Sequence, residues 1–325
     1  MELLIHEYVL LLGNEVKHSM HDNEQRLFTP LNKRVDKVRS TLPSETIGFW
    51  DDVWHRFKKN KPALIGAVLI TFFIIFAIIG PLIVPYEYSK TDLISTYQTP
   101  SRMHWFGTDA LGRDIWSRIW IGARVSLFIA FVTALTQSII GIVIGSISGL
   151  SSSKVDTIIM RFVDILIAIP FLIWVTIFMV VLGPGIQSII FAFSFTGWSG
   201  LARLVRGETL RLKNMEFAIA AKTMGASHLW LMRKHIIPNV LPLVIVMATF
   251  QVTTAIFSEA FLSFIGIGIQ PPLTSWGIMV ANGIAEMHYY PYMLFIPAIF
   301  ISLTMLSLQL IGDGLRDAID PKMRV

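Results

Sequence analysis

Four of the polar or ionisable residues within the apolar runs of this chain are candidates for a function: Asp164, Gln251, Glu259 and Ser263. Such groups are costly in a membrane and are functional candidates by default, so we predict that they contribute to a transport pathway or its gate. For Asp164 we favour a structural ion pair with Arg161, three residues earlier on the same helix face. For Glu259 we favour a contact between helices or a gate over direct substrate binding. Gln251 either lines a polar path or bridges helices.

A serine nucleophile is a second possible chemistry. Gly197-Trp198-Ser199-Gly200 resembles the Gly-x-Ser-Gly motif of rhomboid-type intramembrane proteases. Such a serine needs a histidine base within hydrogen-bond reach. All eight histidines fall outside the runs that we predict to span a membrane. We therefore interpret Ser199 and its glycines as small residues that pack helices, and the protease remains a remote alternative.

Several other chemistries lack the residues that they need. The chain has no Gly-Lys pair, and therefore no Gly-x-x-x-x-Gly-Lys-Ser/Thr loop for a nucleotide phosphate. It has no cysteine, which excludes disulfides and thiolate metal sites. His6-Glu7 has no second histidine four residues later, so a zinc-protease motif is missing. We expect no catalytic residue, no metal and no cofactor on this chain.

The composition indicates a membrane protein. Hydrophobic residues make up 54% of 325 positions and charged residues 15%, whereas a soluble domain has roughly a quarter charged residues. Much of the surface must therefore face lipid. The net charge is +5, but the basic residues lie between apolar runs and not in a patch around aromatic residues. Nucleic acid is therefore not an expected partner.

Six apolar runs are long enough to cross a bilayer, which takes about 20 residues. They span about 63–84, 125–147, 157–182, 186–205, 240–265 and 291–311. Internal glycine and proline are tolerated in such helices, and Gly183-Pro184-Gly185 predicts a tight turn between the third run and the fourth. The predicted fold class is all-α, a polytopic membrane protein with about six transmembrane helices.

Lysine and arginine predict the orientation. They concentrate before the first run, between the fourth and fifth, and after the sixth, whereas residues 268–290 contain none. Both termini and Lys222 are therefore predicted to be cytoplasmic, and Trp105 and Trp276 to lie outside. The predicted divisions are a cytoplasmic tail with an amphipathic membrane-proximal segment (1–61), the first helix and outer loop (62–120), a five-helix core (121–313) and a cytoplasmic C-terminal tail (314–325).

The cytoplasmic segment at about 207–237 contains a predicted short helix. Asn214 is a candidate N-cap, and Glu216 lies in the first turn, where the helix dipole favours an acid. Gly225 suits the left-handed residue that ends a helix, and Ser227 is the predicted cap of a second helix. Ala220 and Ala221 form a small-residue face on the first helix. Such a helix can dock into a groove of another protein, and the alternative is a solvated loop helix.

This segment resembles the coupling loop of binding-protein-dependent ABC permeases. That loop reads Glu-Ala-Ala, three residues, Gly, nine residues, Ile, one residue, Leu-Pro. The chain matches at Ala220, Ala221, Gly225 and Pro238, and departs from the pattern at Ile219 and His235. Segments 106–114, 122–127, 259–268 and 312–322 resemble the peptide-permease branch in the same order. From about Trp50 to the end, the chain is most similar to C-type subunits of oligopeptide permeases.

The resemblance implies a type I ABC importer permease fold and a function. The chain would form half of a translocation pathway for oligopeptides, with dipeptides, nickel or metallophore, or haem as alternative substrates. The implied partners are a second, homologous permease, two cytoplasmic ATPase subunits that hold ATP and magnesium, an extracellular or periplasmic substrate-binding protein, and membrane lipid. The implied location is a bacterial-type cell membrane. The coupling residues would be Glu216, Ala220, Ala221, Gly225, His235 and Pro238.

Overall fold

The computed structural model describes residues 48–320, and all regular secondary structure in that range is helical apart from one isolated β-bridge. The predicted all-α class is therefore confirmed. The chain divides into two compact units, Met1–Asp51 and Asp52–Val325. Apart from residues 48–51, everything described below belongs to the second unit. Most of the predicted N-terminal tail lies outside the described residues, whose first helix is α3 (Phe49–Lys59).

Five helical segments of the described range are long and apolar enough to cross a membrane. They are α4 (Lys61–Ile83), α5 (Ile115–Leu150), α8 with α9 (Ile186–Thr196 and Trp198–Leu212), α11 through α12 (His228–Leu231, a π-helical turn at Met232–Ile236, and Ile237–Phe264), and α14 (Tyr292–Ile319). The pair α6 (Ser153–Ala168) and α7 (Phe171–Leu182) makes a sixth if it is counted as one span. The predicted number of about six is confirmed on that count.

The continuous third span predicted at 157–182 is wrong. Helix α6 ends at Ala168, α7 begins at Phe171, and the two helices are bent by 85°. The cause is Pro170, which has no N–H to donate and disfavours helical backbone at the residue before it. Ile169 accordingly has an extended conformation, with φ −85° and ψ 123°.

Two helices extend further than the apolar runs indicate. Helix α5 begins at Ile115, because the side chain of Asp114 accepts a hydrogen bond from the N–H of Ser117 at 2.8 Å and caps the helix. Helix α14 continues to Ile319, and Gly314 lies so close to α4 that an added Cβ would be 2.3 Å from Cβ of Ala63. The predicted divisions at 120/121 and 313/314 therefore fall inside α5 and α14.

Small residues allow α5 and α9 to lie side by side. Gly141, Gly145 and Gly149 recur every four residues along one face of α5. A Cβ at Gly145 would be 2.5 Å from the carbonyl oxygen of Ala202 on α9. Side chains of this size allow close backbone approach between membrane helices, so this contact depends on glycine.

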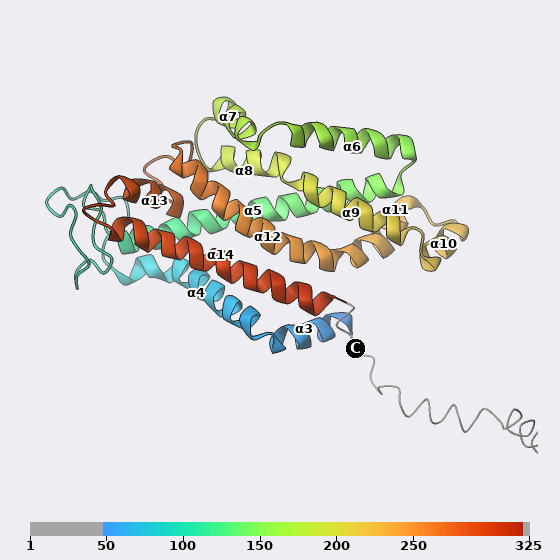
Figure 1. Ribbon diagram of the computed structural model, residues 1–325, viewed down its shortest axis with the longest axis horizontal. Coiled ribbons are helices and arrows are strands. Elements are labelled where there is room, and N and C mark those ends of the chain that lie inside the picture. Colours follow the sequence, from blue (N-terminus) through green and yellow to red (C-terminus); the bar gives the residue numbers. More distant parts are fainter. Residues whose placement is uncertain (1–47, 321–325) are drawn as a thin grey trace, which may run out of the picture. The chain divides into compact units, whose positions relative to one another are not determined.

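The helices place two loop regions at opposite ends of this unit (Figure 1). At one end are the α4–α5 loop (residues 84–114) and the short helix α13 (Trp276–Ala285), which packs against α14, α12 and α5. At the other end are α10 (Glu216–Thr223) and α11. The long helices α5, α12 and α14 run between the two ends.

Candidate functional site

Helix α10 ends as its sequence predicts. Gly225 has φ +88°, and the N–H groups of Gly225 and Ala226 donate to the carbonyl oxygens of Lys222 and Ala221, both at 3.0 Å. This pair of hydrogen bonds is a Schellman motif. Nothing lies within 4 Å of a Cβ built at Gly225, so backbone conformation, not space, explains the glycine.

Of the two predicted N-caps, Ser227 of α11 is confirmed and Asn214 of α10 is wrong. Ser227 caps α11, since its hydroxyl oxygen accepts from the N–H of Trp230 at 3.2 Å. The predicted N-cap of α10, Asn214, is wrong, and that position is occupied by Met215. The amide of Asn214 donates instead to the carbonyl oxygen of Leu210 at the end of α9, at 3.0 Å.

Ala220 and Ala221 of α10 lie on different faces of the helix. Ala221 is 4% exposed and packs with Ala218 in a cluster of the chain's own apolar residues that includes Leu231 and Ile236. Ala220 is exposed. The small-residue face predicted from Ala220 and Ala221 is therefore wrong, because residues 218 and 221 lie one turn apart on the inner face of the helix and residue 220 does not.

The outward side of this region carries large apolar side chains. We call it the apolar turn surface, and its members are between 38% and 82% exposed: Met215, Phe217, Ile219, Met224, Leu229 and Trp230. Exposed basic residues border it at Lys222, Arg233 and Lys234. Several large apolar side chains exposed in one region, with basic residues beside them, are typical of an interaction site. Glu216 is exposed at its edge, in the first turn of α10.

His235 supports this surface from the π-helical turn. Its ring centroid lies 5.3 Å from that of Phe217 and 5.2 Å from that of Trp230. Pro238 follows in the first turn of α12, where a missing N–H is tolerated. His235 therefore joins two exposed aromatic residues that lie on α10 and α11.

An ion pair that sequence reasoning missed joins α6 and α9. Arg206 on α9 donates through Nε and Nη2 to the two carboxylate oxygens of Asp156 on α6, at 2.5 and 2.6 Å. The hydroxyl of Ser148 on α5 donates to the same carboxylate. The charges of Asp156 and Arg206 are visible in the sequence, but a separation of 50 positions gives no indication that they pair.

Asp164 forms an ion pair on the outside of the bundle. Arg203 on α9 donates to its Oδ1 at 2.6 Å, whereas Arg161, the predicted partner, lies 3.9 Å from Oδ2. About half of the Asp164 side chain is exposed. This geometry supports the structural interpretation of Asp164 over a place in a pathway.

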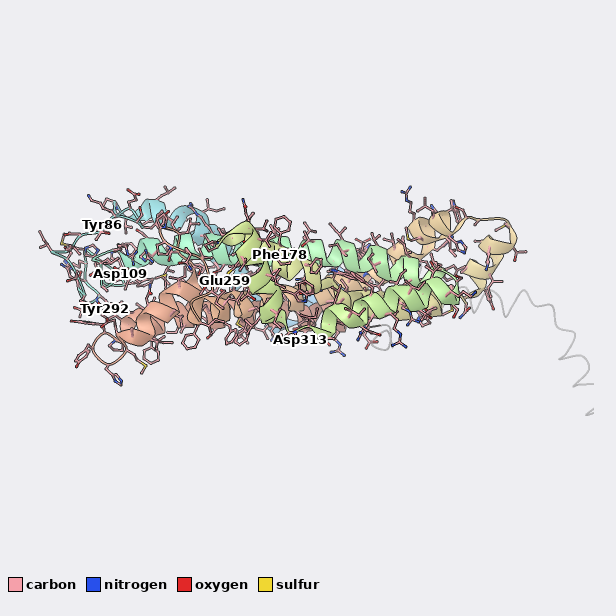
Figure 2. All side chains as sticks on the ribbon, turned by 90° about the horizontal axis from the view of Figure 1, so that it is seen from above. Tyr86, Asp109, Phe178, Glu259, Tyr292 and Asp313 are labelled. Carbon is pink, nitrogen blue, oxygen red and sulfur yellow. The ribbon has the colours of Figure 1, made fainter. Side chains whose placement is uncertain are left out.

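Glu259 is the centre of a buried polar cluster. It is 1% exposed, and three serine hydroxyls donate to its carboxylate: Ser126 at 2.9 Å, Ser263 at 2.9 Å and Ser275 at 2.7 Å. These serines lie on α5, on α12 and at the N-cap of α13. None of the ion pairs among residues 48–320 includes Glu259. Figure 2 shows Glu259 between Asp109 and Asp313 along the long axis of the molecule.

Gln251 lines a separate cavity of about 180 Å³ between α5, α7, α8 and α12. Its Oε1 accepts from Ser138 at 3.3 Å, and Nε2 of Gln137 donates to the carbonyl oxygen of Phe193 at 2.9 Å. Both glutamines therefore bridge helices and also face open space. The polar lining consists of Gln137, Thr196, Gln251, Thr254 and Ser258.

The remaining candidates have no catalytic geometry. Ser199 is 6% exposed, and no hydrogen bond among residues 48–320 joins it to a histidine. Its neighbour Gly197 packs against the side chain of Gln137, whose Nε2 would be 2.3 Å from an added Cβ. Within the described residues, no group of three or more acids and histidines is placed to hold a metal ion.

The α4–α5 loop is fixed by its own polar contacts. Asp92 accepts from the hydroxyl of Ser95 and the N–H of Ile94, and these bonds lower its pKa. Burial, followed by a hydrogen bond to Glu286, raises the pKa of Tyr97. Gly112 has φ +68°, and an added Cβ would meet the carbonyl oxygen of Asp92. The loop is thus a fixed structure next to α13.

Two protein-family descriptions match the chain. Residues 141–325 match the family of binding-protein-dependent transport system inner membrane components. Residues 48–100 match the N-terminal TM domain of oligopeptide transport permease C. The first match covers more than half of the chain and includes the apolar turn surface, Glu259 and Gln251.

Characterised relatives are similar over nearly the whole chain. The oligopeptide transport system permease protein OppC of Bacillus subtilis is 47% identical over 94% of this chain and 100% of its own length. The dipeptide transport system permease protein DppC of the same organism is 42% identical over 90% of this chain and 92% of its own. The inward-facing MetNI methionine ABC transporter is similar in fold, with a TM-score of 0.51, 20% identity, and coverage of 62% of this chain and 96% of that chain.

Proposed function

The chain belongs to the family of binding-protein-dependent transport system inner membrane components, and from this we propose that it is a permease subunit of an ATP-driven oligopeptide importer. The assignment of oligopeptides as the substrate rests on 47% identity to an oligopeptide permease along that relative's whole length. A dipeptide permease at 42% identity keeps dipeptides as the second candidate. These two relatives favour peptides over nickel, metallophores or haem.

In this proposal the apolar turn surface is where ATPase subunits dock. Phe217, Ile219 and Trp230 are large, exposed and apolar, and side chains of this kind dominate binding energy at interfaces. Lys222 and Arg233 at the rim would select an acidic partner surface. Docked ATPases would hold ATP and magnesium and hydrolyse the ATP. This chain would change conformation in response and would not itself be an enzyme.

The proposed pathway runs between this chain and a second, homologous permease. Gln251 and its neighbours would contribute polar lining, because amides and hydroxyls can replace water around peptide groups. Glu259 and Ser263 would hold α13 against α5 and α12 at the outer end. Asp164 is assigned to the ion pair with Arg203. An external binding protein would deliver the peptide to the α4–α5 loop and α13.

Uptake measurements in cells test the substrate class. Deletion of the gene for this chain is expected to reduce uptake of a labelled oligopeptide to background, and expression of the intact chain should restore it. A labelled dipeptide measured in parallel decides between the two peptide classes. Loss of nickel or haem uptake with unchanged uptake of both peptides would refute the proposal.

Labelling of introduced cysteines tests the proposed orientation. The natural chain has no cysteine, so a single one is a unique target. In right-side-out vesicles, an impermeant thiol reagent should label Ile94→Cys, which replaces a 95% exposed side chain, but should not label Lys222→Cys until the membrane is opened. Trp276 is fully buried and is unsuitable as a reporter. External labelling at residue 222 would contradict cytoplasmic termini and a cytoplasmic coupling segment.

A further inference from the structure

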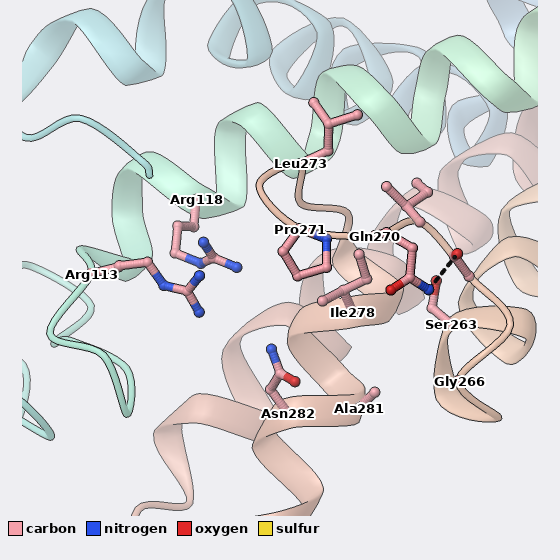
Figure 3. Close-up of a pocket in the computed structure, with 12 residues that line it drawn as sticks. Arg113, Arg118, Ser263, Gly266, Gln270, Pro271, Leu273, Ile278, Ala281 and Asn282 are labelled. Carbon is pink, nitrogen blue, oxygen red and sulfur yellow. Dashed lines mark hydrogen bonds between the residues drawn. The ribbon is translucent and has the colours of Figure 1, made fainter. Parts of the chain in front are cut away.

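A cavity next to the Glu259 cluster is lined by two arginines. Its volume is about 190 Å³, whereas one water requires roughly 15 Å³. Arg113 and Arg118 line one side, and Gln270 and Asn282 line the other. Figure 3 shows both guanidinium groups directed toward the space above Asn282. Ser263, which donates to Glu259 at 2.9 Å, also lines the cavity.

The arginine side of this cavity carries excess positive charge. Nε of Arg113 donates to Oδ2 of Asp109 at 2.7 Å, and Nε of Arg118 lies 3.5 Å from the same oxygen. The carboxylate of Asp109 is therefore shared by the guanidinium groups of Arg113 and Arg118. The three side chains together have a charge of +1. Neither arginine forms an ion pair with any other acid among residues 48–320. A second carboxylate would balance the charge.

Donor groups remain free for such a carboxylate. Within the described part of the chain, Arg113 uses only Nε, so both of its terminal nitrogens have no protein acceptor. Arg118 is 2% exposed and is fixed by hydrogen bonds from Nη1 to the carbonyl oxygen of Tyr88 and from Nη2 to the hydroxyl of Thr274. A fixed guanidinium next to one whose two terminal nitrogens have no acceptor is suited to recognise a planar carboxylate.

We propose that this cavity binds the C-terminal carboxylate of the peptide substrate as it enters the pathway. The inference rests on the proposed function and adds to it the recognised group. Gln270 and Asn282 offer amide groups opposite the arginines, where the last peptide bond of such a ligand would lie. A volume of about 190 Å³ admits a chain end more readily than a loop of a folded protein. Because Ser263 belongs to both sites, the bound carboxylate would lie next to the contacts that hold α13.

The test compares one labelled oligopeptide with its C-terminal amide in the complete importer, reconstituted with its binding protein. Arg113→Gln is expected to lower uptake of the free acid about tenfold, the scale of one hydrogen bond to a charged group, and to leave uptake of the amide within about twofold. For each peptide, the uptake by wild type is divided by the uptake by the variant. A preference of the binding protein for one of the two peptides cancels in this ratio. Arg113→Lys, which keeps the charge, should restore part of the selectivity. Arg102→Gln, an exposed arginine of the same loop, should leave it unchanged.

Other outcomes overturn the inference in distinguishable ways. Arg113→Gln could lower uptake of both peptides equally and also weaken docking of the binding protein or release the second permease. That result would assign Arg113 to a contact between proteins. Unchanged uptake of both peptides by Arg113→Gln would remove the cavity as a site. Either result leaves the proposed function intact. If the wild-type complex transports neither peptide, the proposed function and this inference both fail.

Discussion

Gly225→Val is expected to lower peptide uptake and substrate-stimulated ATP hydrolysis together, by about tenfold, while the protein remains in the membrane at near-normal level. Residue 225 has φ +88°, a conformation that costs a side-chain-bearing residue about 1–2 kcal/mol. A β-branched residue would therefore shift the turn away from the conformation that presents the apolar turn surface. No atom lies within 4 Å of the new Cβ, so no steric clash with the membrane helices contributes.

Gly225→Asn is the matched control, because asparagine tolerates left-handed backbone better than any β-branched residue. We expect it to keep most of the coupled activity and to copurify with the ATPase subunits. Ala221→Trp would not test docking, because Ala221 is buried in the chain's own apolar cluster and a larger side chain there would disturb the fold. If Gly225→Val copurifies with the ATPases and transports like wild type, the α10–α11 region is not the coupling element.

Glu259→Ala is expected to destabilise the protein by roughly 3 kcal/mol, because it leaves three buried serine hydroxyls without their acceptor. Glu259→Gln should behave differently. The amide fills nearly the same space, accepts through its oxygen and donates through its nitrogen, so α5, α12 and α13 remain connected. It loses the stronger hydrogen bonds of a charged acceptor. We expect normal assembly with uptake reduced about tenfold, the scale of one such bond.

Thermal stability of the purified complex and uptake by vesicles together separate these two effects. The alanine variant should lower both the melting temperature and the yield, whereas the glutamine variant should lower uptake alone. Ser138→Ala, which removes a 3.3 Å hydrogen bond to Gln251 elsewhere in the bundle, is a control for loss of one buried hydroxyl. Wild-type uptake, ATPase stimulation and assembly in Glu259→Gln would show that the carboxylate is structural only.

The prolines show how far local sequence decides a membrane helix. Pro81, Pro242 and Pro297 lie inside continuous helices, whereas Pro170 separates two helices bent by 85°. Every proline removes a backbone donor and crowds the preceding turn. Pro242 and Pro297 are buried among neighbouring helices, while Pro170 is exposed and its flanking helices contact different partners, α9 and α8. Those contacts are not visible in the apolar pattern, so the continuous span at 157–182 was wrongly predicted.

Sequence by itself determined the features that depend on neighbouring residues. The apolar runs located the membrane helices, since burial in lipid requires apolar side chains in succession. Glycine at 225 and serine at 227 located a helix end and a cap, because both depend on residues within one turn. The tertiary structure alone decided which of Ala220 and Ala221 faces inward. It also brought Ser126 on α5 to Glu259 on α12 across 133 positions, and Arg203 on α9 to Asp164 on α6 across 39 positions. Such pairings follow from the packing of whole helices, and no local pattern of residues records them.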